Sequence, residues 1–272
     1  MDPLSHVLLG AASGHALARS HRKAAALAGA TGALLPDADV FIPSGSDPLL
    51  TLEYHRHFSH ALALSPIVAL LAAGLAWLLF RRRAPYTVLY GAGLAGVVSA
   101  ILLDACTSYG VHLLWPFREE RYAWSIVAVV DPVMTLILLT GLVLAMRADS
   151  ARRARITVLC ATAYLGLGWI QQQRAEALIA QTASARGHPV IRTEVKPTLG
   201  NLVLWRSIYQ HGNDYVVDAV RAGIFSGPRV YPGAAVAALG PGQLRPPLPP
   251  GSVQARDVER FRRESDGFLV RH

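Results

Sequence analysis

The sequence predicts a mainly α-helical membrane protein, in which a polytopic helical domain precedes a small α/β or β-rich C-terminal domain outside the membrane. Hydrophobic residues make up 52% of the 272 residues. Only 16% are charged, whereas soluble proteins carry about a quarter. The apolar residues form uninterrupted blocks before residue 171, and short arginine clusters lie beside these blocks. That pattern is typical of membrane topology.

Apolar blocks after residue 60 are predicted to cross the membrane as helices. A helix of about 20 apolar residues spans the roughly 30 Å hydrocarbon core. The first block carries no charge and is followed by Arg81, Arg82 and Arg83. The third is interrupted by Asp131-Pro132, and the fourth is shorter than the others. The predicted blocks are residues 61–80, 86–103, 126–146 and 156–170.

The arginine clusters predict the orientation of these helices. Short loops rich in arginine tend to stay in the cytoplasm, which places residues 81–83 and 147–155 inside the cell. Residues 105–125 and everything after 171 are then expected on the non-cytoplasmic side of the inner membrane. Because the positive charge follows membrane topology, we expect membrane lipids as surroundings and no nucleic-acid partner. Cys106 and Cys160 are too few for a disulfide framework.

The N-terminal segment is apolar but divided into shorter pieces. Residues 4–18 and 24–35 flank a basic cluster and are too short to span the membrane comfortably. Two short helices with a cytoplasmic basic turn, or a re-entrant pair, both fit this pattern. A cleaved signal peptide is the less favoured alternative, because no basic segment precedes the apolar stretch.

The composition divides the chain into three regions. We expect a membrane domain over residues 1–170, an extramembrane domain over 171–239, and a proline-rich linker with a charged tail over 240–272. The second region begins with a polar helix at 171–186 and continues with partly alternating segments typical of strands. These segments are residues 190–196, 202–210 and 215–220, and a charged helix or tail follows at 256–266. The small sheet is either a stabilising cap or a lid over a substrate.

The predicted topology brings seven histidines and aspartates to one level of the membrane. Ionisable groups at the edge of apolar segments are unfavourable and by default mark function. All seven fall on the non-cytoplasmic side, although they are spread along half of the chain. They are His6, Asp37, Asp39, His55, His60, Asp104 and Asp131.

Two local patterns leave alternatives open. Asp37 and Asp39 lie in an extended segment, whose alternate residues point to opposite faces. Only one of the two is therefore expected to bind a metal, and the other to support it. His55 and His60 converge only if His55 precedes the helix, whereas His57 and His60 would share one face of a continuous helix.

The two remaining acids lie at expected helix ends. Asp104 closes an apolar helix, where a carboxylate meets the unfavourable end of the helix dipole, and this placement suggests a bound cation. Asp131 precedes Pro132, a pair that starts a helix well. A capping role and a functional role are equally weighted for Asp131.

These side chains predict a membrane-embedded, metal-dependent hydrolase that cleaves an ester or phosphoester, with a lipid as a candidate substrate. Histidine and aspartate ligands without cysteine suit zinc, manganese or a similar divalent ion. One or more such ions lower the pKa of a bound water to about 7 and polarise a carbonyl or phosphoryl oxygen. Arg56 would clamp an anionic oxygen, and a spare carboxylate would take a proton from the water.

The alternative is a non-enzymatic membrane protein, either an ion or proton carrier or a scaffold for the outer domain. Transporters often contain internal repeats and polar residues at the membrane centre. The sequence shows no clear repeat, and its polar groups cluster near one side. Both features favour the enzyme.

Residues 91–96 (GAGLAG) match the dinucleotide-binding fingerprint letter for letter. That fingerprint requires a preceding strand and a following helix in a soluble βαβ unit. Here the segment lies inside an apolar block, where small residues let helices approach closely. We therefore expect this segment to pack helices together.

Several segments together resemble the YdjM-like family of membrane-bound, metal-dependent hydrolases. The resemblance covers about residues 1–146 in the family's order, and is carried by residues 1–6, 34–39, 55–60, 103–116 and 131–132. A looser similarity, a Pro-Asp pair followed by a histidine-rich helix start, is to zinc-dependent phospholipase C. That similarity implies a helical metal site and phosphoester cleavage.

The family resemblance also implies a division of roles. It implies five metal ligands, which are His6, Asp37, His55, His60 and Asp104, and three supporting residues, which are Asp39, Arg56 and Asp131. The sequence departs from the family pattern at His57, where a small residue is expected, and at Ala61, where serine is expected. Neither departure removes an implied ligand.

Overall fold

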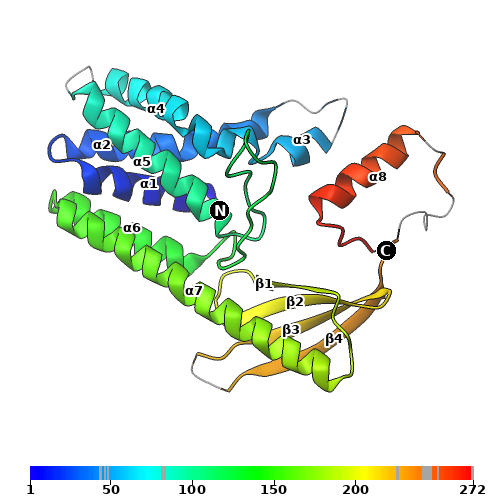
Figure 1. Cartoon of the computed structure of the whole chain (residues 1–272). Coiled ribbons are helices and arrows are strands. Elements are labelled where there is room, and N and C mark those ends of the chain that lie inside the picture. Colours follow the sequence, from blue (N-terminus) through cyan, green and yellow to red (C-terminus); the bar gives the residue numbers. More distant parts are fainter. Residues whose placement is uncertain are drawn as a thin grey trace. The chain divides into compact units, whose positions relative to one another are not determined.

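The computed structural model describes residues 1–42, 45, 47, 49–80, 84–224, 227–240, 247–249 and 251–270. It is mostly helical and contains an antiparallel sheet of four strands toward the C-terminus (Figure 1). The chain divides into two compact units. The first unit, which we call the membrane unit because the sequence predicts that it lies in the membrane, comprises Met1–Phe41, His55–Gln172 and Pro197–Leu202. The C-terminal unit comprises Ile42–Tyr54, Gln173–Lys196 and Val203–His272.

The membrane unit is a bundle of helices, and short 3-10 segments lie between α2 and α4. Helix α1 packs against α2, α5 and α6, and α2 also packs against α4 and α5. Figure 1 shows these helices running side by side. The elements are α1 (Pro3–Leu17), α2 (Arg22–Leu34), η1 (Leu35–Phe41), η2 (Phe58–His60), η3 (Leu62–Leu64), α4 (Ser65–Leu79), α5 (Tyr86–Ala105), α6 (Pro132–Arg147) and the first part of α7 (Ala151–Ala185).

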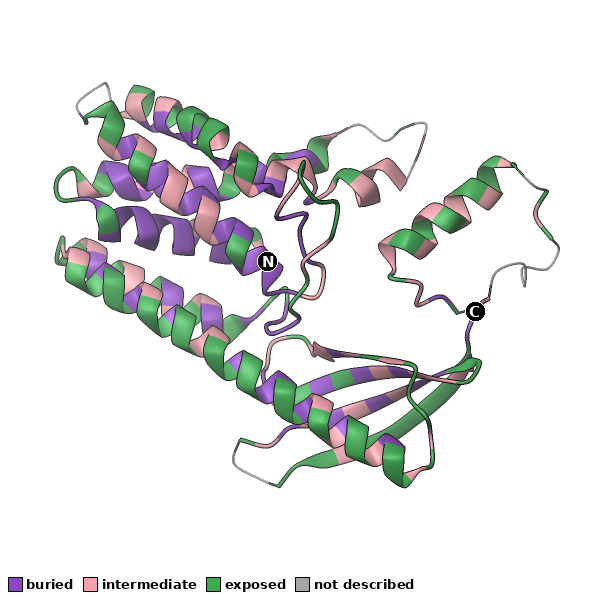
Figure 2. Ribbon diagram, viewed as in Figure 1, coloured by how far each residue is buried: buried purple, intermediate pink, exposed green. Residues whose placement is uncertain are grey.

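Helices α1 and α2 occupy the two short apolar segments of the N-terminus, and the choice between two short membrane helices and a re-entrant pair stays a prediction. Asp2 caps α1, because its carboxylate accepts a hydrogen bond from the backbone nitrogen of Ser5 at 3.0 Å. Pro3 follows in the first helical position, where its fixed φ and missing N–H are tolerated. Most of α1 is buried (Figure 2), so this helix forms the centre of the bundle.

Among the described residues, two segments are long and apolar enough to cross a membrane, Leu62–Leu79 and Tyr86–Ala105. The third predicted block is shorter in the structure, because its helix begins only at Pro132. The fourth predicted block is not a separate helix: residues 156–170 lie within α7, which has 35 residues and continues through the polar segment after 171. Four crossings therefore stay a prediction.

The outer faces of the bundle carry exposed apolar side chains. On α4 these include Leu71, Leu75 and Leu79, and on α6 they include Leu136 and Leu139. Figure 2 shows α4 and α6 mostly in the colours of exposed and intermediate residues. Contiguous apolar surface of this kind is typical of helices that face lipid, and it agrees with the predicted membrane location.

The basic turns meet at one end of the bundle. Arg22, in the first turn of α2, hydrogen bonds to the Asp149 carboxylate in the α6–α7 turn at 3.2 Å. These two residues line a cavity of about 250 Å³ together with Phe80 and Ala84, at the ends of α4 and α5. Arg81 to Arg83, which the sequence places at this end, lie outside the described residues.

Glycines bring the backbones of α1, α2 and α5 into direct contact. A Cβ atom on Gly10 would overlap the carbonyl oxygen of Gly29, and a Cβ atom on Gly96 would overlap the same oxygen. Gly32 and Gly93 form a second contact between α2 and α5. The segment at 91–96 therefore packs helices, as the sequence analysis expects.

Replacing Gly96 by alanine is expected to lower the free energy of unfolding by about 1–3 kcal/mol, because the added methyl group forces α5 away from α2. The matched control is Gly91→Ala on the same helix, where a Cβ atom meets nothing within 4 Å. This control should stabilise the helix by about 0.5–1 kcal/mol. Thermal unfolding of the purified variants measures both changes, and equal melting temperatures would contradict the packing argument.

The C-terminal unit contains the sheet, which follows the order β1-β2-β3-β4. Strands β1 (Arg192–Pro197), β2 (Leu204–His211) and β3 (Asp214–Arg221) confirm the predicted strand segments. Trp205 and Tyr209 on β2 are fully buried and pack with Ile179 and Ala183 on the C-terminal part of α7. Helix and sheet therefore share one core, which is the small mixed domain that the sequence predicts.

The fourth strand, β4 (Arg229–Ala237), is absent from the sequence prediction. It contains Pro232 and Gly233, which normally argue against a strand. The structure accommodates them at the edge of the sheet through a register shift between Val217 and Ala219. The backbone nitrogen of Gly233 there donates to the Asp218 carboxylate at 3.0 Å.

Two further helices belong to the C-terminal unit, α3 (Leu49–Tyr54) and α8 (Val253–Glu264). Of the helix or tail that the sequence predicts at 256–266, the structure forms the helix α8. Its Arg260 binds both carboxylate oxygens of Glu53 at 2.6 and 2.7 Å. Of the predicted proline-rich linker, residues 241–246 and 250 lie outside the described residues.

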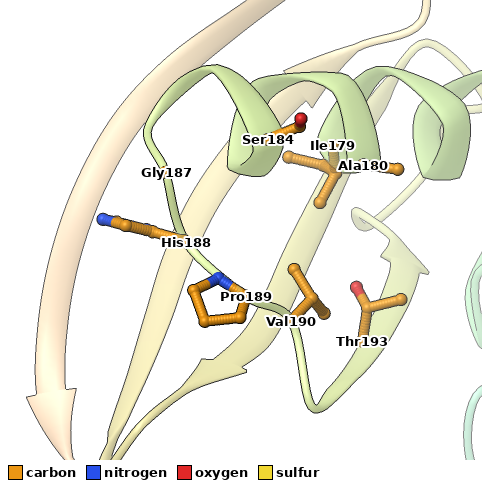
Figure 3. A pocket seen from close by; sticks show the side chains of 8 residues that line it. All are labelled: Ile179, Ala180, Ser184, Gly187, His188, Pro189, Val190 and Thr193. Carbon is orange, nitrogen blue, oxygen red and sulfur yellow. The ribbon is translucent and has the colours of Figure 1, made fainter.

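The C-terminal unit also holds a cavity of about 470 Å³ between the end of α7 and the chain that leads into β1 (Figure 3). Ile179, Val190 and other aliphatic side chains line most of it. His188 lines one side, where its Nδ1 lies 2.9 Å from the Tyr209 hydroxyl. The lining contains no acidic residue, so this cavity offers no mixed carboxylate and histidine site.

Candidate metal centre

The polar residues gather at the end of the membrane unit that is opposite to the basic turns. The first turns of α1, the η1 segment after α2, the η2 turn and the last turn of α5 meet there. Figure 1 shows the chain's N-terminus at this end of the bundle. The backbone nitrogen of Asp2 also donates to the Val129 carbonyl at 2.9 Å, which ties α1 to the α5–α6 connection.

Three side chains form the centre of this cluster. His6, Asp37 and Asp104 each present one ligand atom, and these atoms all lie within 4.8 Å of one another. The Nδ1 of His6 lies 3.1 Å from an Asp37 oxygen, and its Nε2 lies 3.1 Å from an Asp104 oxygen. His6 and Asp104 are fully buried, while the Asp37 side chain is 18% exposed. The centre is therefore reached from the Asp37 side.

His60 is the fourth member of the group. Its Nε2 lies 3.3 Å from an Asp37 oxygen and 3.2 Å from an Asp104 oxygen, and the ring is fully buried. Four of the predicted ligands thus lie together, although they come from four separate elements. We call His6, Asp37, His60 and Asp104 the His-Asp group.

Asp39 lies behind this group and holds the segment that carries His60. Its carboxylate accepts hydrogen bonds from the Arg56 backbone nitrogen at 2.8 Å and from the Ser59 hydroxyl at 2.6 Å. The Nδ1 of His60 lies 3.4 Å from the same carboxylate, so the Nε2 atom points into the His-Asp group. A carboxylate behind a histidine is the usual way to orient a metal-binding imidazole. Asp37 is thus placed to bind, and Asp39 to support.

The predicted ligand His55 lies outside the His-Asp group. Its Nδ1 is 2.8 Å from Asp39, and its ring centre is 6.5 Å from that of His60. The next residue, Arg56, has a left-handed backbone with φ of 59°, a conformation that is uncommon outside glycine. This turn directs His55 toward Asp39, an outcome that helical spacing does not anticipate.

Arg56 is enclosed within the cluster, whereas the sequence analysis expects it to clamp a substrate. Its Nη2 lies 3.1 Å from an Asp104 oxygen, its Nη1 lies 3.4 Å from the Thr107 hydroxyl, and the residue is 5% exposed. The amino group of Met1 also forms an ion pair with Asp104. Arg56 therefore neutralises and positions Asp104.

Asp131 acts as a helix cap in the structure. Its carboxylate accepts a hydrogen bond from the backbone nitrogen of Met134 at 2.9 Å. The Tyr164 hydroxyl donates to the same carboxylate, 2.9 and 3.0 Å from its two oxygens. Asp131 is fully buried and is not part of the His-Asp group. Of the two equally weighted roles, the geometry supports capping.

The surroundings keep the carboxylates charged. Burial raises the pKa of Asp37, but the neighbouring imidazoles of His6 and His60 outweigh this effect and hold the pKa below its usual value. For Asp39, burial is likewise outweighed by the hydrogen bonds from His55, His60 and Ser59, and its pKa is also lowered. Ionised carboxylates next to imidazoles provide the charge that a divalent cation requires.

Two buried atoms in the cluster are suited to a cation. The Nε2 of His60 and one oxygen of Asp104 lie 3.2 Å apart, yet neither makes a hydrogen bond within the described part of the chain. Buried polar atoms without a partner are unfavourable. Because both are metal-ligand atoms and face the same centre, the set of two imidazoles and two carboxylates fits zinc or manganese.

Several residues at this site are missing from the sequence prediction. The rings of Tyr109 and His55 lie 5.3 Å apart, and the guanidinium groups of Arg56 and Arg121 lie 5.1 and 4.9 Å from the Tyr109 ring. Tyr109 lies only five positions after Asp104, so its sequence position could have indicated that it belongs to the site. Arg121 is brought close by a returning segment in which Tyr122 pairs with Val111, a pairing for which the local sequence gives no signal.

The model of a family described as YdjM inner membrane protein matches residues 1–175. The matched range contains the whole His-Asp group and ends within α7, before the sheet of the C-terminal unit. No curated protein and no solved structure matches this chain.

Proposed function

We propose that this chain, which belongs to the YdjM inner membrane protein family, is a metal-dependent hydrolase that cleaves an ester or phosphoester bond. The observation that carries this proposal is the His-Asp group. Two imidazoles and two carboxylates from distant parts of the sequence converge at one end of a membrane bundle. Such convergence of ionisable side chains next to apolar helices usually marks function.

A divalent ion, zinc or manganese by the chemistry of the donors, would lower the pKa of a water molecule and polarise the oxygen of the bond to be cleaved. His6, Asp37, His60 and Asp104 would hold it. Asp39 orients His60, and Arg56 fixes Asp104. Asp39 and Arg56 would keep the ligand atoms in place without binding the metal themselves.

His55 is the best-placed group to move a proton. Its Nδ1 is fixed on Asp39 at 2.8 Å, and its side chain is 26% exposed, so the other ring nitrogen is available to a reacting water. In the hydrolysis, the water oxygen bonds to the carbonyl carbon or phosphorus, and the bond to the alcohol oxygen breaks. His55 takes one proton from the water and returns it to the leaving oxygen. Arg121, beside Tyr109, is placed to attract an anionic substrate.

The membrane setting extends this proposal. By the arginine rule the site and the C-terminal unit lie on the non-cytoplasmic side, at the level of the lipid headgroups. Membrane lipids are then the nearest ester and phosphoester compounds. The C-terminal unit serves either as a stabilising cap or as a lid.

The test is metal analysis of the purified full-length protein, followed by hydrolysis assays with zinc and manganese on ester and phosphoester substrates. We expect bound transition metal, a lower melting temperature after chelation, and metal-dependent hydrolysis. His55→Gln should keep the metal and lower kcat by about 10²–10⁴-fold. His21→Gln, a change of an exposed histidine in the α1–α2 turn, is the matched control and should leave both unchanged.

Other results would contradict the proposal. Protein without metal whose stability does not respond to chelator would show that the cluster is only a network of ion pairs. Bound metal with no hydrolysis, together with ion flux in vesicles that His60→Ala abolishes, would favour the carrier.

A further inference from the structure

An apolar groove begins at the exposed side of the His-Asp group. It has a volume of about 420 Å³, which lies within the range of about 300–1,000 Å³ for small-molecule sites. The start of α1, the end of α2 and the η1 segment form its walls. The lining residues are Pro3, Thr31, Leu34, Leu35, Asp37, Ala38, Val40 and Phe41.

The side chains in this groove provide a single charged group. The Thr31 hydroxyl donates to the Leu27 carbonyl within its own helix at 2.9 Å, which satisfies its donor. Asp37 is the only ionisable residue in the lining, and its two oxygens face His6 and His60. A ligand in the groove would therefore be apolar along its length and polar only at the end near Asp37.

The open side of the groove is itself apolar. Leu34, Val40 and Phe41 are 44%, 53% and 84% exposed. Large exposed apolar side chains next to each other mark contact with a protein or a membrane. Because this chain belongs to an inner membrane protein family and its outer helices are also apolar, the surrounding lipid is the medium that reaches this groove.

We propose that the groove binds one acyl chain of a membrane phospholipid, so that the polar end of that lipid lies at the His-Asp group. Asp37 lines the groove and belongs to the group, and it provides the continuity between the two. The proposal rests on the proposed function, because it gives the hydrolase a phospholipid as its substrate class. The acyl chain comes from the bilayer, which is itself apolar. The groove therefore positions the lipid and adds little affinity of its own.

The test uses the full-length protein in nanodiscs of phosphatidylethanolamine and phosphatidylglycerol. A small fraction of the lipid carries a photoreactive diazirine near the end of one acyl chain, and the crosslinked residues are mapped by mass spectrometry. We expect crosslinks concentrated on residues 31–41. Ala38→Trp fills the groove from an exposed lining position and should lower these crosslinks about tenfold, equivalent to about 1.4 kcal/mol.

The matched control is Ala163→Trp, which changes an exposed alanine on α7 outside the groove and should leave the pattern unchanged. Val40→Trp fills the same groove and replaces Ala38→Trp if that variant does not fold. Metal content is measured on every variant and should stay at the wild-type level. Crosslinks at 31–41 that persist in both groove variants would show only lipid around the bundle and overturn the proposal.

The two proposals can fail separately. If the protein binds metal and hydrolyses its substrate, but the crosslinks at 31–41 are unchanged in the groove variants, the acyl site is rejected and the hydrolase is kept. Groove-dependent crosslinks in a protein that binds no metal would keep the lipid site and reject the hydrolase.

Discussion

Asp104→Asn is expected to abolish metal binding and to lower the free energy of unfolding by about 3–5 kcal/mol, the usual effect of removing one partner of a buried ion pair. Asp104 is fully buried and contacts the Arg56 guanidinium at 3.1 Å and the Met1 amino group. The amide removes the negative charge but keeps the shape, so the Arg56 guanidinium stays buried without the carboxylate that it contacts. It also replaces a ligand oxygen of the His-Asp group. Elemental analysis and thermal unfolding measure the two effects.

Asp131→Asn is the matched control for this change. Asp131 is equally buried, but it caps α6 and accepts from Tyr164. Asparagine still caps a helix and still offers an oxygen to the tyrosine. Metal content should stay at the wild-type level, and stability should change by no more than about 1 kcal/mol. If Asp104→Asn bound metal as well as Asp131→Asn does, the assignment of Asp104 as a ligand would be wrong.

Asp39→Asn is expected to weaken metal binding about 10–100-fold, the usual effect of losing a group that orients a ligand. Asp39 receives hydrogen bonds from the Arg56 backbone and the Ser59 hydroxyl, and contacts His55 and His60. Asparagine has an NH2 group in place of one carboxylate oxygen. This NH2 group would face another hydrogen-bond donor, such as the Arg56 backbone nitrogen or the Ser59 hydroxyl. His60 then loses the contact that points its Nε2 into the His-Asp group.

The measurement is a metal titration at constant pH, together with the melting temperature. Ser59→Ala is the control, because it removes one hydrogen bond to Asp39 and leaves the carboxylate intact. Its metal affinity should fall less than that of Asp39→Asn. Equal affinities for wild type and Asp39→Asn, in a folded protein, would show that Asp39 only stabilises the loop.

The fold follows from the sequence where local pattern decides the structure. The apolar segment at 4–18, the block at 86–103 and the partly alternating segment at 202–210 form α1, α5 and β2 with small shifts of their ends. The polar residues after 171 do not end α7, because no proline or glycine interrupts the helix there, and its buried residues then face the sheet. Local composition cannot reveal that new packing surface.

The sequence predicts which residues form the site better than it predicts the role of each residue. Topology alone brings His6, Asp37 and Asp104 to one end of the bundle. The choice between the two acids of η1 depends on which of them faces His6, a contact across 31 positions of sequence. The position of His55 depends on the left-handed turn at Arg56. Neither contact has a local signature.

The glycine contacts between α1, α2 and α5 have a consequence for how the protein tolerates variation. Gly10, Gly29 and Gly96 are not members of the His-Asp group, yet a side chain at any of them would separate the helices that carry His6 and Asp104. A saturation mutagenesis screen for function would therefore report these three glycine positions as being as intolerant as the His-Asp group. Positions in this bundle that do not tolerate substitution therefore include the glycines that pack the helices as well as the residues of the His-Asp group.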